Sequence, residues 1–170
     1  MELELKKITL DMEQAYLNFA QEWADNGEEI IPFSARLNGR NYKEFVEETK
    51  KIETDAPSGL VNATTLFLTC ADEIIGAINI RHTLNEYLLN FGGHIGYGIR
   101  PSKRGRGYAK AMLQMIYPLL NELGLERILI TCTSDNIASA KTIEGCGGKF
   151  ENEVIDEKNI VFRRYWLSIR

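Results

Sequence analysis

The amino-acid sequence predicts one α/β domain in which helices cover the faces of a mixed sheet. Three observations support this prediction. The chain has 170 residues, the usual length of one domain. Strand and helix patterns follow one another with no repeat, low-complexity segment or linker between them. The composition, 44% hydrophobic and 26% charged, is that of an ordinary globular protein. We therefore expect a single domain over residues 1–170.

The first half of the chain carries three strand patterns and two helix patterns. Alternating apolar and polar residues begin the first strand, and Asp11 can cap the helix that follows it. Ala71-Asp72-Glu73 separates two apolar runs and predicts a hairpin. The expected elements are a strand over 2–10, a helix from 11 to 26, a helix over 41–51, a loop over 54–62, and strands over 64–69 and 73–81.

The second half of the chain is organised around a basic, glycine-rich loop. The expected elements are a loop or helical turn over 83–93, a strand over 94–100, the basic loop over 101–107, a helix over 107–123, a strand over 127–131, a helix from 134 to 145, and strands over 149–155 and 160–169. Apolar residues three and four apart give the 107–123 helix one apolar face. Pro118 lies inside that pattern and should kink or break the helix, and Gly124 ends it.

The charge balance argues against one class of partner. Twenty Lys and Arg residues against twenty-four Asp and Glu residues give a net charge of −4. A protein that grips nucleic acid over a broad surface needs a basic face, so we expect no nucleic-acid partner. The N-terminal residues lack the pattern of a secretory signal, and no apolar run approaches the roughly 18 residues that span a bilayer. We therefore expect a cytoplasmic protein with no membrane partner.

The three cysteines predict neither disulfides nor a metal site. Cys70, Cys132 and Cys146 are odd in number and form no CxxC pair, which argues against a disulfide framework or a zinc site. Cys132 lies in the apolar run 128–132, where we interpret it as a small buried hydrophobic residue rather than a nucleophile. The sequence gives no reason to expect a bound metal.

The loop over 101–109 has the features of an anion-binding site. It follows a strand and opens a helix, and its glycines allow backbone N–H groups to turn toward one point. The first N–H groups of a helix have no internal partner and carry partial positive charge, which suits a pyrophosphate. Lys103, Arg104 and Arg106 add formal charge. The alternative is a plain helix N-terminus with solvated basic side chains.

Two common phosphate-binding motifs do not match. The nearest approach to a P-loop is Gly145–Lys149, which lacks the first glycine and is followed by Phe150 instead of Ser or Thr. The residues 105–109 do not form the dinucleotide-binding pattern GxGxxG. The strands before them read as a hairpin rather than a βαβ unit.

The loop does resemble the motif of another family. Arg104-Gly105-Arg106-Gly107-Tyr108-Ala109 matches the Arg/Gln-x-x-Gly-x-Gly/Ala motif of the GNAT superfamily of N-acetyltransferases. Further along, Asp135-Asn136-Ile137-Ala138-Ser139 resembles the family's Asn-x-x-Ser/Ala block. Gly147-Gly148-Lys149-Phe150 resembles its Gly-Phe ending, with Lys149 inserted. The run 92–101 resembles a little-characterised bacterial subgroup.

This resemblance covers essentially the whole chain, most specifically residues 94–150. It implies a mixed, mostly antiparallel central sheet flanked by helices, with a C-terminal β-hairpin. It also implies a reaction, the transfer of an acetyl group from acetyl-coenzyme A to the amine of a small molecule or a peptide, with no metal. A homodimer stays open as the oligomeric state.

The resemblance also implies a set of cofactor contacts. In the family, the backbone N–H groups of the loop hold the pyrophosphate of acetyl-coenzyme A. A backbone N–H near Ile99 is implied as the donor to the oxyanion. Asn136 bonds the cofactor arm, caps the helix that follows it, or does both. The implied cofactor-binding residues are Ile99, Arg104, Gly105, Arg106, Gly107, Tyr108, Ala109, Asn136 and Ser139.

The sequence offers two histidines as candidates for the general base, His94 and His82. The family often places a Glu or a water-holding polar residue near the position of His94, and imidazole titrates at about pH 6.5. Gly96 and Gly98 should leave the strand face beside His94 open. The alternative is a structural His94 that hydrogen-bonds a neighbouring loop. His82 is a second candidate, with loop anchoring as its alternative role.

The usual proton donor of the family is missing. Many members have a Tyr seven residues after the Asn, where this sequence has Ile143. Ser139 can substitute directly or through water, or it can merely contact the cofactor or cap its helix. Tyr97 and Tyr165 are further candidates. The expected catalytic residues are His94, Ser139 and Tyr97.

Two functions of different class follow from these residues. The first is an N-acetyltransferase that acts on a primary amine by direct transfer. The second is a non-catalytic acyl-coenzyme A binding or sensor module, which Ile143 keeps open, although His94 and Ser139 favour the enzyme. Glu28 and Glu29 would steer a cationic amine if they lined the acceptor site. We favour the alternative for this pair, a solvated loop whose Ile and Phe residues plug the core.

Overall fold

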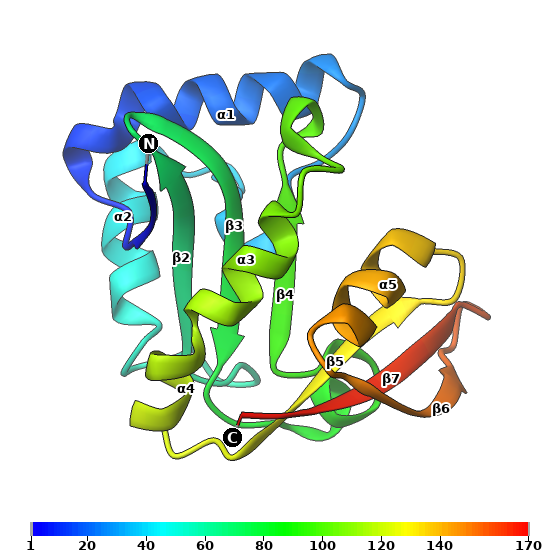
Figure 1. Ribbon diagram of the computed structural model, residues 1–170. Coiled ribbons are helices and arrows are strands. Elements are labelled where there is room, and N and C mark those ends of the chain that lie inside the picture. The colour runs from blue at the N-terminus through cyan, green and yellow to red at the C-terminus, as the bar shows by residue number, and fades with distance from the viewer. Residues whose placement is uncertain (1, 170) are drawn as a thin grey trace.

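The computed structural model describes residues 2–169. Within them, seven strands form one sheet in the order β1-β2-β3-β4-β5-β7-β6 (Figure 1). The strands are β1 (Leu3–Lys6), β2 (Ala63–Cys70), β3 (Glu73–Arg81), β4 (Ile95–Ile99), β5 (Arg127–Thr133), β6 (Lys149–Ile155) and β7 (Val161–Ser168). Neighbouring strands are antiparallel except β4 and β5, which are parallel. The prediction of a mixed, mostly antiparallel sheet with a C-terminal hairpin is confirmed.

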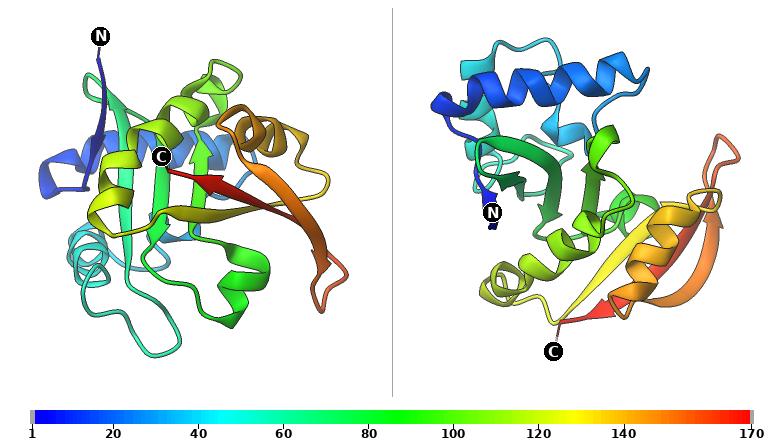
Figure 2. Two further views of the ribbon diagram at one scale, coloured as in Figure 1. Left: turned by 60° about the horizontal axis from the view of Figure 1, so that its bottom comes forward. Right: turned by 45° about the horizontal axis from the view of Figure 1, so that its top comes forward.

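Helices cover both faces of the sheet. They are α1 (Glu13–Asp25), α2 (Tyr42–Lys51), α3 (Tyr108–Met115), α4 (Tyr117–Glu122) and α5 (Ile137–Gly145). Figure 2 shows α1 and α2 on one face, with α3 and α4 on the other. Each face has its own apolar core. An aromatic cluster that includes Tyr16, Phe19 and Phe67 lies under α1 and α2, while Met112 and Ile143 belong to the cluster under α3 and α5.

The ends of the helices agree with the sequence in two places and differ in one. Pro118 breaks the helical pattern as predicted, since α3 ends at Met115 and α4 begins at Tyr117. Asn41 caps α2 in a capping box with Glu44. The prediction that Asp11 caps α1 is wrong. Asp11 lies inside a 3-10 turn, Leu10–Met12, that precedes α1, and no side chain caps the helix.

The parallel pair β4 and β5 meets at one point and then separates. Its register consists of Ile95 opposite Ile130. Figure 1 shows the two strands diverging from there, with α3 beside one and α5 beside the other. Because Ile95 bonds toward β5 and backbone direction alternates along a strand, the N–H groups of Tyr97 and Ile99 point into the opening. We call this opening, bordered by β4 and β5 beyond Ile95 and Ile130, the β4–β5 gap.

Candidate active site

The loop between β4 and α3 exposes backbone donors at the start of the helix. After a 3-10 turn, Pro101–Lys103, the chain passes through Gly105 and Gly107 with φ angles of 71° and 81°. These left-handed conformations favour glycine, and a Cβ on either glycine would meet no atom within 4 Å. Within residues 2–169, no hydrogen bond engages the N–H groups of Gly105, Arg106 or Gly107. This loop therefore has the free donors that an anion site at a helix N-terminus needs.

The basic side chains of this loop are not all available to an anion. Lys103 Nζ lies 2.7 Å from a carboxylate oxygen of Glu73. Arg104 donates two hydrogen bonds to Glu28, at 2.6 and 3.0 Å. Within the described residues, Arg106 is the one cation of the three for which the structure shows no ion pair. The expectation that all three cations surround the anion site needs correction, because carboxylates neutralise two of them.

A pair of hydroxyl groups lies beside the β4–β5 gap. Tyr97 on β4 and Ser139 in the first turn of α5 approach to 2.7 Å between their side-chain oxygens. The N–H of Ser139 donates to Asn136 Oδ1 at 3.1 Å, so Asn136 caps α5, as one of its two predicted roles required. Burial raises the pKa of Tyr97 to about 12, so the phenol keeps its proton at neutral pH. The structure thus brings together two predicted catalytic residues that lie 42 positions apart.

Tyr97 supplies a phenol beside α5, a helix that carries no tyrosine of its own. Ile143, at the family's usual Tyr position, is fully buried in the apolar cluster beneath α5. Tyr165, the other candidate, is also buried and packs its ring against Phe150. No signal in the sequence paired Tyr97 with Ser139, because the pairing depends on how far β4 and β5 diverge.

Cys132 points to the same face of the sheet as Ile130 but is not activated. It is a free thiol, 7% exposed, and burial raises its pKa. A nucleophilic cysteine needs a lowered pKa. Its environment fits the predicted role of a small buried hydrophobic residue.

His94 sits in a buried hydrogen bond, and the open face predicted beside it is absent. Leu129 donates its backbone N–H to His94 Nδ1 at 2.9 Å, and the residue is 6% exposed. A Cβ on Gly98 would lie 2.3 Å from the carbonyl oxygen of Ile31, and one on Gly96 would touch Pro32. The prediction of an open face is therefore wrong, because the segment after α1 packs against it.

The surroundings of His94 also make it a weak base. Burial, with a smaller contribution from the nearby Arg81 guanidinium, lowers the pKa of His94 to about 4. Since Nδ1 accepts from Leu129, the proton of the neutral ring is on Nε2. These contacts favour the structural alternative for His94. His82 likewise bonds Thr64, through Nε2 to Oγ1 at 2.8 Å, as loop anchoring requires.

The acidic pair after α1 is occupied by arginines. Glu28 bonds Arg104, and Glu29 lies 2.9 Å from Arg36. Both carboxylates are thus partnered within the protein, which favours an anchoring role over steering of a cationic amine. Of the apolar residues that follow, Ile30 is buried as the favoured alternative requires, whereas Ile31 is 48% exposed and Phe33 is 66% exposed, so neither of these two plugs the core.

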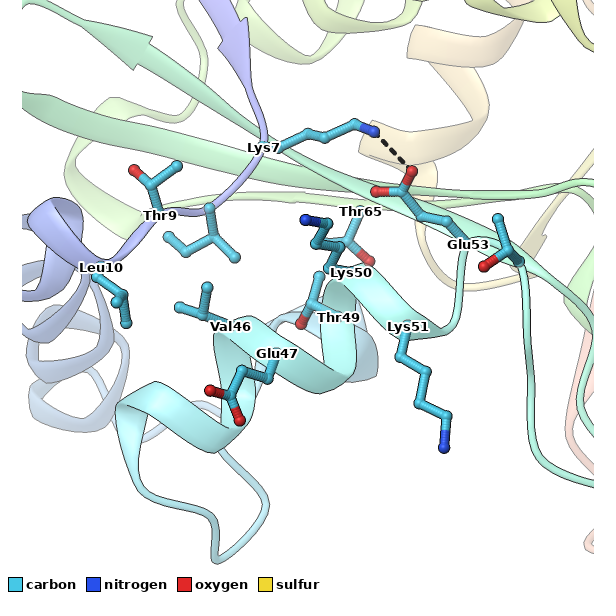
Figure 3. Close-up of a pocket in the computed structure, with 12 residues that line it drawn as sticks. Lys7, Thr9, Leu10, Val46, Glu47, Thr49, Lys50, Lys51, Glu53 and Thr65 are labelled. Atoms are coloured by element: carbon cyan, nitrogen blue, oxygen red, sulfur yellow. Dashed lines mark hydrogen bonds and ion pairs between the residues drawn. The ribbon is translucent and has the colours of Figure 1, made fainter.

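A groove elsewhere in the molecule shares no residue with this site. It has a volume of about 790 Å³ and lies between α2 and the segment that leads from β1 to α1 (Figure 3). Apolar Ile8, Leu10 and Val46 line it together with threonine and charged side chains, and Lys7 bonds Glu53 at its rim. None of the predicted site residues lines the groove, so the site remains the loop and the β4–β5 gap.

No helix within residues 2–169 has the length and apolar character needed to cross a membrane. In the same range, no group of three His, Cys, Asp or Glu side chains is placed to hold a metal ion.

Comparisons with known proteins concern the family and the fold of the chain. A model of the acetyltransferase (GNAT) domain family matches residues 2–149. The chain is similar to the solved structure of the microcin C7 self-immunity acetyltransferase MccE in complex with acetyl-CoA and AMP, with 18% identity, a TM-score of 0.68, and coverage of 98% of this chain and 92% of that one. No sequence among curated proteins matches the chain.

Two further solved structures are similar over nearly the whole chain. One is a Salmonella typhimurium acetyltransferase that modifies the N-terminal serine of ribosomal protein L7/L12, with 17% identity, a TM-score of 0.71, and coverage of 99% of this chain and 95% of that one. The other is Mycobacterium smegmatis RimJ in complex with CoA-disulfide, with 16% identity, a TM-score of 0.70, and coverage of 98% and 81%. At these identities the similarity establishes a shared fold.

Proposed function

This chain belongs to the GNAT family of acetyltransferases, and from that premise we propose that it transfers an acetyl group from acetyl-coenzyme A directly to a primary amine. The observation that carries the proposal is the arrangement of the donor loop and the β4–β5 gap. Free N–H groups begin α3 at one end of the gap, and the hydroxyls of Tyr97 and Ser139 lie beside it. This arrangement joins a site for phosphates to a site for acyl transfer.

The residues present fit acetyl-coenzyme A as the donor. The N–H groups at the start of α3, from Gly105 to Ala109, would receive the pyrophosphate. The edge of β4 that faces the gap, with the N–H groups of Tyr97 and Ile99, would receive the amide-rich arm and the thioester oxygen. We retain the predicted donor contacts except Arg104, whose guanidinium is bonded to Glu28: Ile99, Gly105, Arg106, Gly107, Tyr108, Ala109, Asn136 and Ser139. Bound acetyl-coenzyme A supplies a thioester, from which the amine takes the acetyl group and a thiolate departs.

The Tyr97–Ser139 pair would stabilise the departing thiolate. The phenol has a pKa of about 12, whereas an alkyl thiol has one of about 8.5, so Tyr97 donates a hydrogen bond to sulfur without losing its proton. Ser139 Oγ–H would donate to the phenol oxygen, which makes the phenol O–H a better donor. In this role Tyr97 replaces the hydroxyl that Ile143 cannot offer.

The amine must be neutral to attack the thioester. With a reference pKa of about 10.4, only about one alkylamine in two thousand is neutral at pH 7. His94 was expected to accept the proton, but its Nδ1 is occupied and its basicity is low. We therefore propose that the proton leaves to solvent and that His94 holds β4 against β5.

The acceptor class is the open part of the proposal. Among the similar structures, one protein modifies the N-terminal serine of a ribosomal protein, and another is described as a spermidine N-acetyltransferase chimera. A panel for this chain should therefore include peptides with free N-termini and small alkylamines.

Thiol release from acetyl-coenzyme A, measured across this panel, tests the proposal. We expect release that depends on one amine class and product that carries the mass of an added acetyl group. If every amine class stays silent while acetyl-coenzyme A still raises the melting temperature, the non-catalytic binding module replaces the enzyme. If acetyl-coenzyme A has no effect on melting, the donor site itself is disproved.

A further inference from the structure

The end of α1 and the turn after it grip the loop that precedes α3. Glu22 and Glu28 come from this segment, and both carboxylates bond groups between residues 100 and 104. The contacts join parts of the chain that lie 76 to 80 positions apart. They hold the loop at Arg100, Ser102 and Arg104, just before the residues with free N–H groups.

Glu22 holds the first turn of the loop through both of its oxygens. One oxygen accepts from Arg100 Nε at 2.6 Å, and the other accepts from the backbone N–H of Ser102 at 2.7 Å. Arg100 is 7% exposed and also donates to Glu73 at 3.1 Å. Although burial opposes it, the hydrogen bonds from Ser102 and Arg100 lower the pKa of Glu22, so the carboxylate is charged at neutral pH.

Glu28 holds the second half of the loop through Arg104. The guanidinium donates to both oxygens of Glu28 and lies 4.9 Å over the ring of Trp23, while its Nε donates to the carbonyl of Ile99 at 3.0 Å. A planar guanidinium that is bidentate on one side and stacked on an aromatic ring is fixed in orientation. Arg104 is thereby committed to the protein rather than to a phosphate.

We propose that Glu28 and Glu22 are positioning residues that pre-shape the donor-phosphate loop, and that the side chain of Arg104 contributes to acetyl-coenzyme A binding through Glu28 instead of by contact with phosphate. The inference rests on the proposed function, which places the donor phosphates on this loop. Its physical basis is preorganisation. Gly105 and Gly107 give the loop conformational freedom that it must lose when its N–H groups converge on an anion. The contacts of Glu22 and Glu28 with residues 100–104, which we call the clamp, remove part of that freedom before the anion binds.

Binding of acetyl-coenzyme A to four proteins tests the proposal: the wild type, Glu28→Gln, Arg104→Gln, and the double variant, measured by titration calorimetry. We expect each single variant to bind acetyl-coenzyme A about tenfold more weakly than the wild type. The double variant should bind no more weakly than the weaker single variant, because both changes break the same contact between Glu28 and Arg104. If Arg104 instead contacted phosphate directly, the double variant would bind acetyl-coenzyme A more weakly than either single variant. Wild-type affinity in Glu28→Gln would overturn the proposal.

Glu29→Gln is the matched control. It makes the same chemical change one residue away, at a carboxylate that pairs with Arg36 and does not touch the loop. It should keep wild-type affinity. Once the panel has given an acceptor amine, Glu28→Gln should raise the KM for acetyl-coenzyme A about tenfold and leave kcat within twofold of the wild type. General destabilisation of the protein would not raise KM alone.

Amide hydrogen exchange separates this inference from the proposed function, because it needs no ligand. In the free protein, the hydrogen-bonded amides of residues 102–104 should exchange faster in Glu28→Gln than in Glu29→Gln, with equal melting temperatures as the check on folding. Equal exchange would reject the clamp. If exchange differs but the wild type does not bind acetyl-coenzyme A, the clamp stands and the donor assignment of the loop falls.

Discussion

The phenol oxygen of Tyr97 lies 2.7 Å from the hydroxyl oxygen of Ser139, which joins β4 to the first turn of α5 at the edge of the β4–β5 gap. Tyr97 lies on β4 and Ser139 lies on α5, which follows β5. Their contact therefore depends on how far β4 and β5 diverge. It also gives the protein a pair of hydroxyls beside α5, whereas the buried Ile143 offers none.

Tyr97→Phe tests this pair of hydroxyls directly. The change removes one oxygen and leaves the ring in its place, so kcat should fall by about 10- to 100-fold while acetyl-coenzyme A affinity stays within twofold. Ser139→Ala should cause a smaller fall, because the phenol remains. Steady-state thiol release with the best amine of the panel measures both.

The double variant Tyr97→Phe/Ser139→Ala provides the control for a shared role. If Ser139 acts only through Tyr97, the double variant should be no slower than Tyr97→Phe alone. Losses that multiply would assign Ser139 a separate contact with the substrates. An unchanged rate in Tyr97→Phe would remove the phenol from the mechanism.

Gly107→Val should abolish binding of acetyl-coenzyme A. The residue has a φ of 81°, which a β-branched side chain resists, and a valine would occupy open space next to the free N–H groups of the loop. We expect affinity to fall at least about 100-fold in a calorimetric titration.

Gly124→Val is the matched control for that variant. Gly124 has a φ of 72° and equally open surroundings but lies after α4, away from the loop. It should lose stability, by about 1 to 3 kcal/mol, and keep its affinity. If both variants lose affinity for acetyl-coenzyme A to the same extent, backbone strain rather than the position of Gly107 in the loop explains the loss.

His94→Asn distinguishes a structural from a catalytic histidine. The Asn side-chain oxygen can accept the Leu129 N–H in place of Nδ1, but an amide is not a base. We expect kcat within about threefold of the wild type, since the hydrogen bond is the role that the structure favours. A fall of about 100-fold, with affinity for acetyl-coenzyme A unchanged, would restore His94 as the base.

The buried His94 should also make folding pH-dependent. Its pKa is about 4 in the folded protein and about 6.5 when unfolded, so between these values the unfolded chain binds the extra proton. Stability from this residue is complete above pH 6.5 and is lost as the pH falls toward 4, by up to about 3 kcal/mol. Urea unfolding from pH 4 to 7 should show this slope, and its difference from His94→Asn isolates the contribution of the imidazole.

Local patterns in the sequence were enough to predict most of the fold. Alternation and apolar spacing marked the strands and helices, and Pro118 marked the break between α3 and α4, because these signals are short-range. Asp11 was misjudged for a related reason: a residue suited to capping does not fix which turn becomes the first of the helix, and a 3-10 turn came first.

The candidate site was only partly predictable. The loop motif and the Asn136 cap were visible because each lies within a few neighbouring residues. The surroundings of His94, Gly96 and Gly98 were not, since the segment that covers the two glycines lies more than 60 positions earlier. Separation along the chain also hid the carboxylates that neutralise Lys103 and Arg104, since Glu73 lies 30 positions before Lys103 and Glu28 lies 76 positions before Arg104.

The sequence by itself determined most of the elements, the glycine-rich loop at the start of α3, and the absence of the usual Tyr at position 143. These follow from dihedral preferences, periodicity and residue identity, which need no partner in space. Tertiary structure alone decided the pairing of Tyr97 with Ser139, the burial of His94, and the hold of Glu22 and Glu28 on the loop. Each of these is a long-range contact, fixed by where the sheet and α1 place the chain and therefore invisible to any local pattern.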